Sequence, residues 1–118
     1  MEFTDTLKQN HEFRRLYSKG KSAVTPYLVL YARKGRRKQN RIGFTVSTKI
    51  GNAVTRNRVR RRLRELYRIH EREFLTGMDI VVVARGRAVG AQYMQLERAF
   101  LGACRKLALL RDTGGSDL

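Results

Sequence analysis

The chain of 118 residues carries 26 Lys and Arg against 10 Asp and Glu, a formal net charge of +16 with both histidines neutral. Its length fits one small domain, and its hydrophobic content of 42% is typical of a globular rather than a disordered protein. Because Cys104 is the one cysteine, the chain has no internal disulfide. One cysteine and two distant histidines are also too few ligands for a zinc site. The longest apolar run, residues 80–84, is too short to span a membrane. The excess charge predicts a polyanionic partner.

The first predicted element is a short amphipathic helix over residues 9–18. Phe13, Leu16 and Tyr17 recur there at helical spacing. Asn10 is the predicted N-cap, and Gly20 lies just beyond the end of the helix.

Three strands are predicted next, over residues 22–24, 27–32 and 41–47. Residues 33–41 hold six basic side chains and predict a solvated hairpin loop between the second and third strands. The third strand alternates between an apolar face, which we expect to be buried, and a face of small or polar residues. These faces carry Ile42, Phe44 and Val46 on one side and Gly43, Thr45 and Ser47 on the other.

The second half of the chain predicts two helices, over residues 54–74 and 92–111, with a strand over residues 79–85 between them. That strand is apolar on both faces, which is typical of a central strand covered on both sides, and the strand–helix–strand order predicts that it runs parallel to the preceding strand. The fold class is therefore α+β, a two-layer α-β-β-β-α-β-α domain with a four-stranded sheet. Residues 1–111 form the predicted single domain, and residues 112–118 a flexible C-terminal tail.

The helix over residues 54–74 concentrates the positive charge. Between Lys49 and Arg72 the chain has nine Lys or Arg and two Glu. At 100° per residue, several of these side chains fall on the face opposite the apolar stripe, where they repel one another unless a counter-anion lies against them. A phosphate backbone fits, because the planar guanidinium forms paired bonds to phosphate and free N–H groups at the start of a helix attract an anion. This face contains Asn57, Arg61, Arg64, Arg68 and Arg72.

Residues 43–61 read Gly-Phe-Thr-Val-Ser-Thr-Lys-Ile-Gly-Asn-Ala-Val-Thr-Arg-Asn-Arg-Val-Arg-Arg, which resembles the signature of the protein subunit of bacterial ribonuclease P. The hallmark of that family is an Arg-Asn-Arg helix after a Gly-x-Ala-Val turn. Residues 7–13 and 79–85 extend the resemblance, which covers roughly residues 7–111. Thr48 departs from the family pattern, where a second lysine is common, and removes one charge.

The resemblance implies a ribonucleoprotein whose catalytic centre belongs to a large RNA, with the magnesium ions held mainly by that RNA and no catalytic residue or predicted metal ligand in the protein. It also implies the same order of elements and a left-handed crossover at the basic helix, against the usual right-handed rule. The predicted contacts to the catalytic RNA are Lys49, Asn52, Arg56, Asn57, Arg58, Arg60, Arg61, Arg64 and Arg68.

A second predicted surface is a cleft for single-stranded RNA. Aromatic residues of the first helix and of the strand over residues 27–32 face small residues on the strand over residues 41–47, a combination that suits unpaired bases stacking on rings. By resemblance these positions contact the 5′ leader of precursor tRNA. The predicted cleft residues are Phe13, Arg14, Tyr17, Tyr31, Thr45 and Ser47.

The residues offer little support for an independent enzyme. His11 and His70 fall on different helices, and no Asp/Glu cluster resembles a two-metal nuclease site. Two alternatives stay open, a ribosomal protein, which more often has long basic tails, and a DNA-binding domain, which favours Asn or Gln beside Arg on a reading helix. The expected partners are the catalytic RNA and the precursor tRNA leader, with one protein per RNA. The protein alone is expected to be a monomer, without membrane association, in the bacterial cytoplasm.

Overall fold

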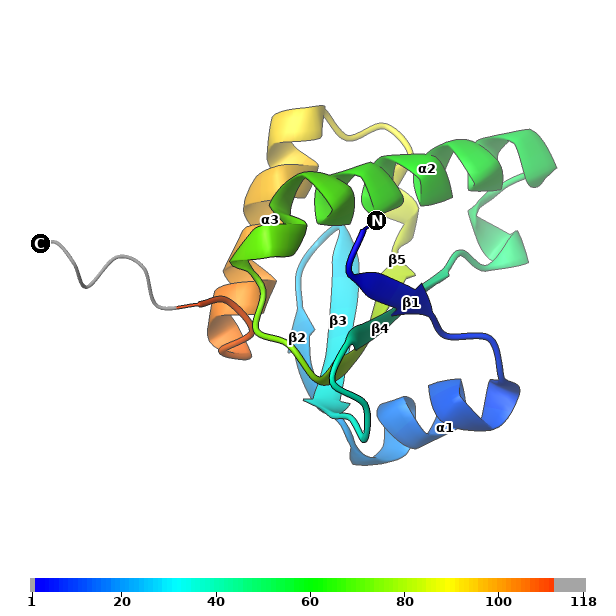
Figure 1. Ribbon diagram of the computed structural model, residues 1–118. Coiled ribbons are helices and arrows are strands. Elements are labelled where there is room, and N and C mark those ends of the chain that lie inside the picture. Colours follow the sequence, from blue (N-terminus) through cyan, green and yellow to red (C-terminus); the bar gives the residue numbers. More distant parts are fainter. Residues whose placement is uncertain (1, 112–118) are drawn as a thin grey trace, which may run out of the picture.

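The computed structural model describes residues 2–111, which form three helices and a five-stranded mixed sheet (Figure 1). In this part of the chain no helix combines the length and apolar character needed to cross a membrane. The predicted tail, residues 112–118, lies outside the described residues. The strands are β1 (Thr4–Thr6), β2 (Lys21–Val24), β3 (Leu28–Lys34), β4 (Asn40–Thr45) and β5 (Met78–Ala84), and the helices are α1 (Asn10–Lys19), α2 (Ala53–His70) and α3 (Tyr93–Lys106).

Strand β5 is the centre of the sheet. The strand order is β1-β4-β5-β3-β2, with β5 parallel to β4 and antiparallel to β3. Ile80 is paired with Ile42 on one side and with Ala32 on the other. The prediction of a central strand parallel to the preceding one is confirmed. The left-handed crossover from β4 through α2 to β5, implied by the resemblance, stays a prediction.

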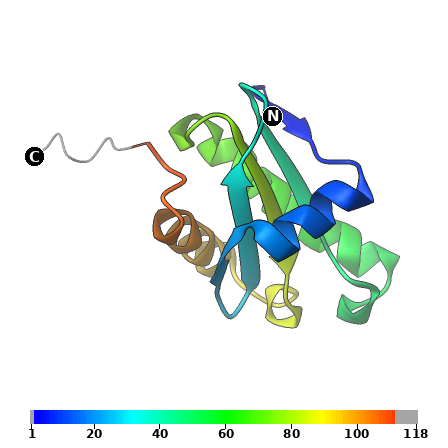
Figure 2. The same ribbon diagram turned by 90° about the horizontal axis from the view of Figure 1, so that it is seen from below.

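Helices cover both faces of the sheet, so the two-layer prediction is wrong. Figure 2 shows α1 in front of the sheet and α2 and α3 behind it. The alternating side chains of β5 enter two separate cores, because successive residues of a strand point to opposite faces. Ile80 and Val82 belong to the larger core with α2 and α3, whereas Val81 packs with Leu7 and Leu16 on the α1 side.

The sheet has a fifth strand that the sequence pattern does not signal. Strand β1 pairs parallel with β4, Thr4 opposite Asn40 and Thr6 opposite Ile42. The predicted four-stranded sheet is wrong here because Thr4–Thr6 is short, polar and at an edge, and so lacks an apolar alternation. Backbone pairing with β4, rather than burial of its own side chains, holds β1 in place.

The predicted hairpin between the second and third strands is also wrong. Strand β5 lies between β3 and β4, so the basic residues 35–39 connect two strands that do not pair with each other. The loop is fixed to the end of β5 where the backbone N–H of Gly35 donates to the carbonyl of Gly77 at 2.7 Å. A local pattern of basic and turn residues cannot show that a later strand will insert between its neighbours.

The three helices differ from prediction at their ends. Gln9, rather than Asn10, is the N-cap of α1, in a capping box with Glu12. Helix α2 ends at His70, and residues 71–73 continue it as a single 3₁₀ turn. Helix α3 ends at Lys106, short of the predicted residue 111, because Ala108 takes a left-handed conformation with φ 56°.

His70 links the end of α2 to α3. Its ring nitrogens contact the carboxylates of Glu73 and Glu97, the latter at 2.9 Å, and its side chain is 13% exposed. Burial lowers the pKa of His70, but hydrogen bonds and charges from the two carboxylates outweigh burial and raise it above its ordinary value. The folded state therefore favours the protonated ring.

We expect His70→Gln to lower the free energy of unfolding by about 1 kcal/mol near pH 6 and by less at pH 9. The raised folded pKa adds stability that is fully present below the unfolded pKa, about 6.5, and is lost as the pH rises through the higher folded pKa. Urea unfolding of both proteins across this range measures the difference. His11→Gln, at an exposed position on α1, is the control. A difference that grows with pH would contradict the assignment.

Candidate nucleic-acid interface

Helix α2 separates an apolar face from a basic one. Val59, Leu63, Leu66 and Tyr67 are buried against the sheet and α3. The opposite face exposes most of the predicted contacts, Asn57, Arg58, Arg61, Arg64 and Arg68, while Arg56 and Arg60 are half-buried at its border. Within residues 2–111, no carboxylate lies within 4.0 Å of the guanidinium nitrogens of Arg56, Arg58, Arg60, Arg61 or Arg64. These charges are available to an external anion.

The start of α2 is fixed by two side-chain caps. The Asn52 side chain accepts a hydrogen bond from the backbone N–H of Thr55 at 2.9 Å. Just before it, Ser47 Oγ accepts from the backbone N–H of Lys49 at 3.1 Å and starts the 3₁₀ turn η1 (Thr48–Ile50). Asn52 and Ser47, both predicted RNA contacts, thus also define where the basic helix begins. Lys49 itself is exposed beside it.

Three arginines of α2 have hydrogen-bond partners within the protein. Arg60 donates to the side-chain oxygen of Asn57 at 2.9 Å. Arg68 donates to both carboxylate oxygens of Glu65, at 2.9 and 2.6 Å, and this pairing lowers the pKa of Glu65. Arg62, on the flank of the helix, donates to the carbonyl of Ala91 at 2.7 Å and so ties α2 to the start of α3. The predicted contact Arg68 is therefore partly neutralised, whereas Arg61 and Arg64 are not.

A groove lies between α1 and the last residues of β4. Phe13 and Tyr17, one helical turn apart, form its α1 side, and the Tyr17 hydroxyl lies 3.0 Å from Thr45 Oγ1. Tyr31 stands behind Tyr17, with the two rings edge to face at 5.0 Å between centroids. Tyr17 is 40% exposed, so its ring is accessible. The groove is lined by Asn10, Phe13, Arg14, Tyr17, Phe44, Thr45, Val46 and Arg60.

The groove and the basic face of α2 form one continuous surface. Strand β1 covers the edge of β4 only as far as Ile42, so the edge beyond it is open between α1 and α2. Arg60 of α2 lines the groove, and the Arg64 guanidinium lies 5.9 Å from the centroid of the Phe44 ring. The alternation along this strand predicts a buried Phe44. It is half-buried, and the open edge of β4 is what brings it to the surface.

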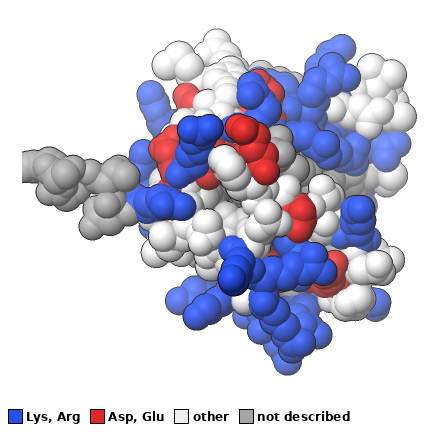
Figure 3. All heavy atoms as spheres, in the orientation of Figure 1, with Lys and Arg blue, Asp and Glu red and all other residues white. Residues whose placement is uncertain are grey.

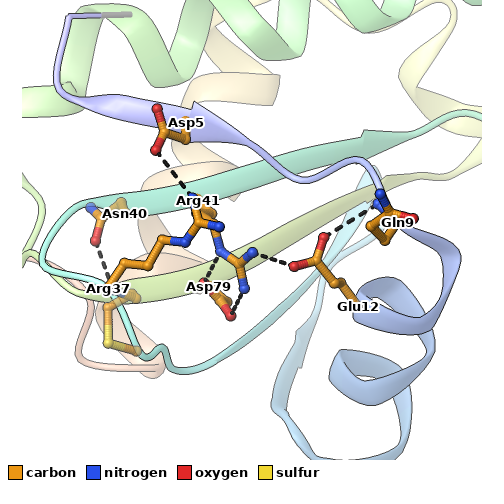
Figure 4. Close-up of polar contacts among 8 residues, drawn as sticks. Asp5, Gln9, Glu12, Arg37, Asn40, Arg41 and Asp79 are labelled. Atoms are coloured by element: carbon orange, nitrogen blue, oxygen red, sulfur yellow. Dashed lines mark hydrogen bonds and ion pairs between the residues drawn. The ribbon is translucent and has the colours of Figure 1, made fainter.

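Arg41 holds the frame of the groove together (Figure 4). Its guanidinium donates to both carboxylate oxygens of Asp79 at 3.0 and 2.8 Å and also pairs with Glu12 on α1. These partners raise the pKa of Arg41. Burial raises the pKa of Glu12, but hydrogen bonds from the backbone of Gln9 and from Arg41 outweigh it and lower the pKa overall. The sequence pattern indicates Arg41 only as a loop cation at the start of the predicted strand over residues 41–47. No local pattern signals partners that lie 29 and 38 residues away.

The model of the family described as Ribonuclease P matches residues 1–108. The chain belongs to this family. It is 42% identical over 106 residues to the ribonuclease P protein component of Natranaerobius thermophilus, covering 90% of this chain and 92% of that protein. It is 41% identical over 110 residues to that of Alkaliphilus metalliredigens, covering 93% of this chain and 99% of that protein.

Solved structures of ribonuclease P proteins have the same fold. The protein from Staphylococcus aureus superposes with a TM-score of 0.82 at 31% identity, over 90% of this chain and 97% of that one. The protein from Thermotoga maritima gives 0.75 at 27% identity, over 83% of this chain and 93% of that one. The chain is the protein component of ribonuclease P, the endoribonuclease that processes the 5′ end of precursor tRNA. The ribosomal-protein and DNA-binding alternatives are therefore discarded.

Gly43 lets the Phe13 ring lie directly on β4. A Cβ atom at Gly43 would lie 2.5 Å from Phe13 Cζ and 3.3 Å from Leu7 Cβ. Gly43, on the small-residue face of this strand, thus sets the depth of the groove. The ring is half-buried by this contact and still lines the groove.

We expect Gly43→Ala to destabilise the protein by about 1–3 kcal/mol, because the added methyl group displaces the Phe13 ring. In the double variant with Phe13→Leu the penalty of the alanine should be smaller, since the clashing ring is gone. Thermal or urea unfolding of the four proteins in the cycle measures this coupling. Gly102→Ala, on α3 with no atom near the added carbon, is the control and should be neutral or stabilising. Additive effects in the cycle would contradict the contact.

Proposed function

We propose that the ribonuclease P protein uses its two adjoining surfaces for two RNAs. The basic face of α2 binds the catalytic RNA, and the groove between α1 and β4 binds the 5′ leader of precursor tRNA. The observation that carries the proposal is Arg60, which lies on α2 and also lines the groove. One guanidinium at the junction places the two bound strands next to each other.

The α2 surface suits a phosphate backbone. Its guanidinium groups lack acidic partners among the described residues, apart from Arg68, and Asn57, Arg60, Arg61 and Arg64 line a small hollow along the helix. Paired N–H donors in such a hollow match phosphate oxygens. The proposed contacts to the catalytic RNA are Lys49, Asn52, Arg56, Asn57, Arg58, Arg60, Arg61, Arg64 and Arg68.

The groove suits an unpaired strand. Its accessible aromatic rings offer stacking surfaces that any base can use, and arginines from α1 and α2 stand at its two sides. A leader of variable sequence needs this kind of recognition, which depends little on base identity. The proposed leader contacts are Phe13, Arg14, Tyr17, Tyr31, Thr45 and Ser47.

Magnesium enters the proposal through the RNA. Among residues 2–111 there is no group of three or more His, Cys, Asp or Glu side chains that could hold a metal ion. We assign the magnesium ions mainly to the catalytic RNA. The basic surface of the protein lowers the repulsion between the catalytic RNA and precursor tRNA and so favours the binding of one RNA to the other. The proposed particle contains one protein per RNA, and the protein is a monomer when alone. Its residues 1–111 form one RNA-binding domain, and the particle acts in the bacterial cytoplasm.

We expect Phe13→Leu to weaken binding of precursor tRNA to the holoenzyme by about 1–3 kcal/mol, because leucine keeps an apolar side chain at this position but removes the stacking ring. Equilibrium binding of precursor and mature tRNA measures the effect, and mature tRNA, which lacks a leader, should be unaffected. Equal losses for both tRNAs would remove Phe13 from the leader site.

We expect binding of the catalytic RNA to weaken steeply with salt, with a slope of log affinity against log salt of roughly −4 to −5 if about six phosphates are contacted. Arg61→Ala combined with Arg64→Ala should reduce the slope by about 1.5. Arg98→Ala combined with Arg105→Ala, two exposed positions on α3, is the charge-matched control. A wild-type slope shallower than about −2, or the same affinity for the α2 double variant as for the wild type, would exclude this face.

A further inference from the structure

A second hollow lies beyond the C-terminal end of α2, away from the groove. Its walls come from the N-terminal segment, the β3–β4 loop, the turn after α2 and the end of the described chain. Phe74, at its floor, is buried in the larger core. The residues that line it are Phe3, Thr4, Lys38, Gln39, Asn40, Glu71, Arg72, Phe74, Thr76 and Arg111.

The hollow presents an aromatic ring that the fold holds at the surface. Phe3 is 47% exposed although the Arg72 guanidinium lies over its ring, 5.6 Å from the centroid. The backbone N–H groups of Phe3 and Glu2 each donate to the Glu71 carboxylate at 2.9 Å, and Thr4 Oγ1 donates to it at 2.6 Å. Glu71 is 7% exposed, so its charge serves to position this segment. An exposed ring that is held in place through its backbone offers a fixed surface on which a flat group can stack.

Cationic side chains line the same hollow as the ring. Lys38 comes from the β3–β4 loop, and Arg111 is held by its Nε donating to the carbonyl of Phe74 at 3.0 Å. Arg72 has an exposed carboxylate, Glu2, at 3.8 Å. A ring flanked by Lys and Arg suits a nucleotide, because the base stacks on the ring while the phosphate meets the cations.

The position of the hollow indicates which RNA supplies the nucleotide. Arg72 lies in the 3₁₀ turn just after α2 and follows Arg61, Arg64 and Arg68 of the exposed helix face, so the hollow lies beyond the end of the surface proposed for the catalytic RNA. At a helical rise of about 1.5 Å per residue, the backbone of Arg72 lies roughly 16 Å along the helix axis from that of Arg61. The groove adjoins the middle of the helix, at Arg60 and Arg64. In Figure 3, Lys and Arg side chains gather at the upper right of the molecule, where α2 begins, and at its lower edge, and acidic side chains lie among them at the upper left.

We propose that this hollow binds an unpaired nucleotide of the catalytic RNA, with its base stacked on Phe3 and its phosphate held by Lys38 and Arg111. The inference rests on the proposed function, since it extends the catalytic-RNA surface of α2 past the end of that helix. Glu71 acts as a positioning residue, because it touches the backbone of Phe3 and not the nucleotide.

The absence of tryptophan from the whole chain gives a direct test. Phe3→Trp places a single fluorophore in the hollow, and its emission should be quenched when the full-length protein binds the ribonuclease P RNA. Val24→Trp, at a 62% exposed position on β2 at the opposite edge of the sheet, is the control and should keep its emission. Precursor tRNA alone, added in a separate titration, should quench neither variant.

Affinity measurements complete the test. Phe3→Ala should bind the catalytic RNA about fivefold or more weakly, Phe3→Trp at least as tightly as the wild type, and Lys38→Ala more weakly than the control Arg98→Ala. If the wild type binds the catalytic RNA but the Phe3→Trp emission is not quenched and Phe3→Ala binds with unaltered affinity, this inference is overturned and the proposed function is not. Quenching by precursor tRNA but not by the catalytic RNA would also overturn it. No binding of the catalytic RNA by the wild type would overturn the proposed function as well.

Discussion

The structure depends on a strand that is buried on both faces. Strand β5 pairs with β3 and β4 and sends alternate side chains into the two cores, so α1 on one face and α2 and α3 on the other pack against the same seven residues. The RNA surfaces follow from this arrangement. Because the parallel pair β4 and β5 needs a crossover, α2 is placed along one face, and because β1 is short, the edge of β4 stays open beside it. The groove is the gap that these two constraints leave.

The acidic residues allow this concentration of positive charge to be directed outward. Every Asp and Glu between residues 2 and 111 has a partner: Arg41 binds Glu12 and Asp79, His70 binds Glu73 and Glu97, Glu65 binds Arg68, Glu71 binds the N-terminal segment, and Glu2 and Asp5 lie near Arg72 and Arg37. Most of these pairs join separate elements. The carboxylates therefore stabilise the fold at its junctions, and the arginines at the start and middle of α2 have no carboxylate partner among the described residues.

The sequence predicted what depends on local periodicity. The apolar stripe of α2, the alternation in β4 and the doubly apolar β5 each show in a few consecutive residues, and the basic face follows once the helix is placed. Long-range relations were not predictable in this way. Pairing of a polar strand such as β1, insertion of β5 between β3 and β4, and the Arg41 and Glu71 clusters all join residues far apart in the chain, so no window of sequence contains both partners. The predicted site residues on α1, β4 and α2 nevertheless meet, because the sheet brings these elements together.

The proposed junction of two RNA surfaces at Arg60 has a consequence for how so small a protein would serve two RNAs. Phosphates on neighbouring strands repel each other over the Debye length, about 8–10 Å at physiological salt, and a row of guanidinium groups between them replaces that repulsion with attraction on both sides. Mobile cations can supply the same charge, but they lose translational freedom when they are held, whereas the α2 arginines are already fixed by the packing of Val59, Leu63 and Leu66 beneath them. The burial of the apolar face of α2 thus prepares its charged face. In a particle whose chemistry belongs to RNA, this fixed charge is what a folded protein adds.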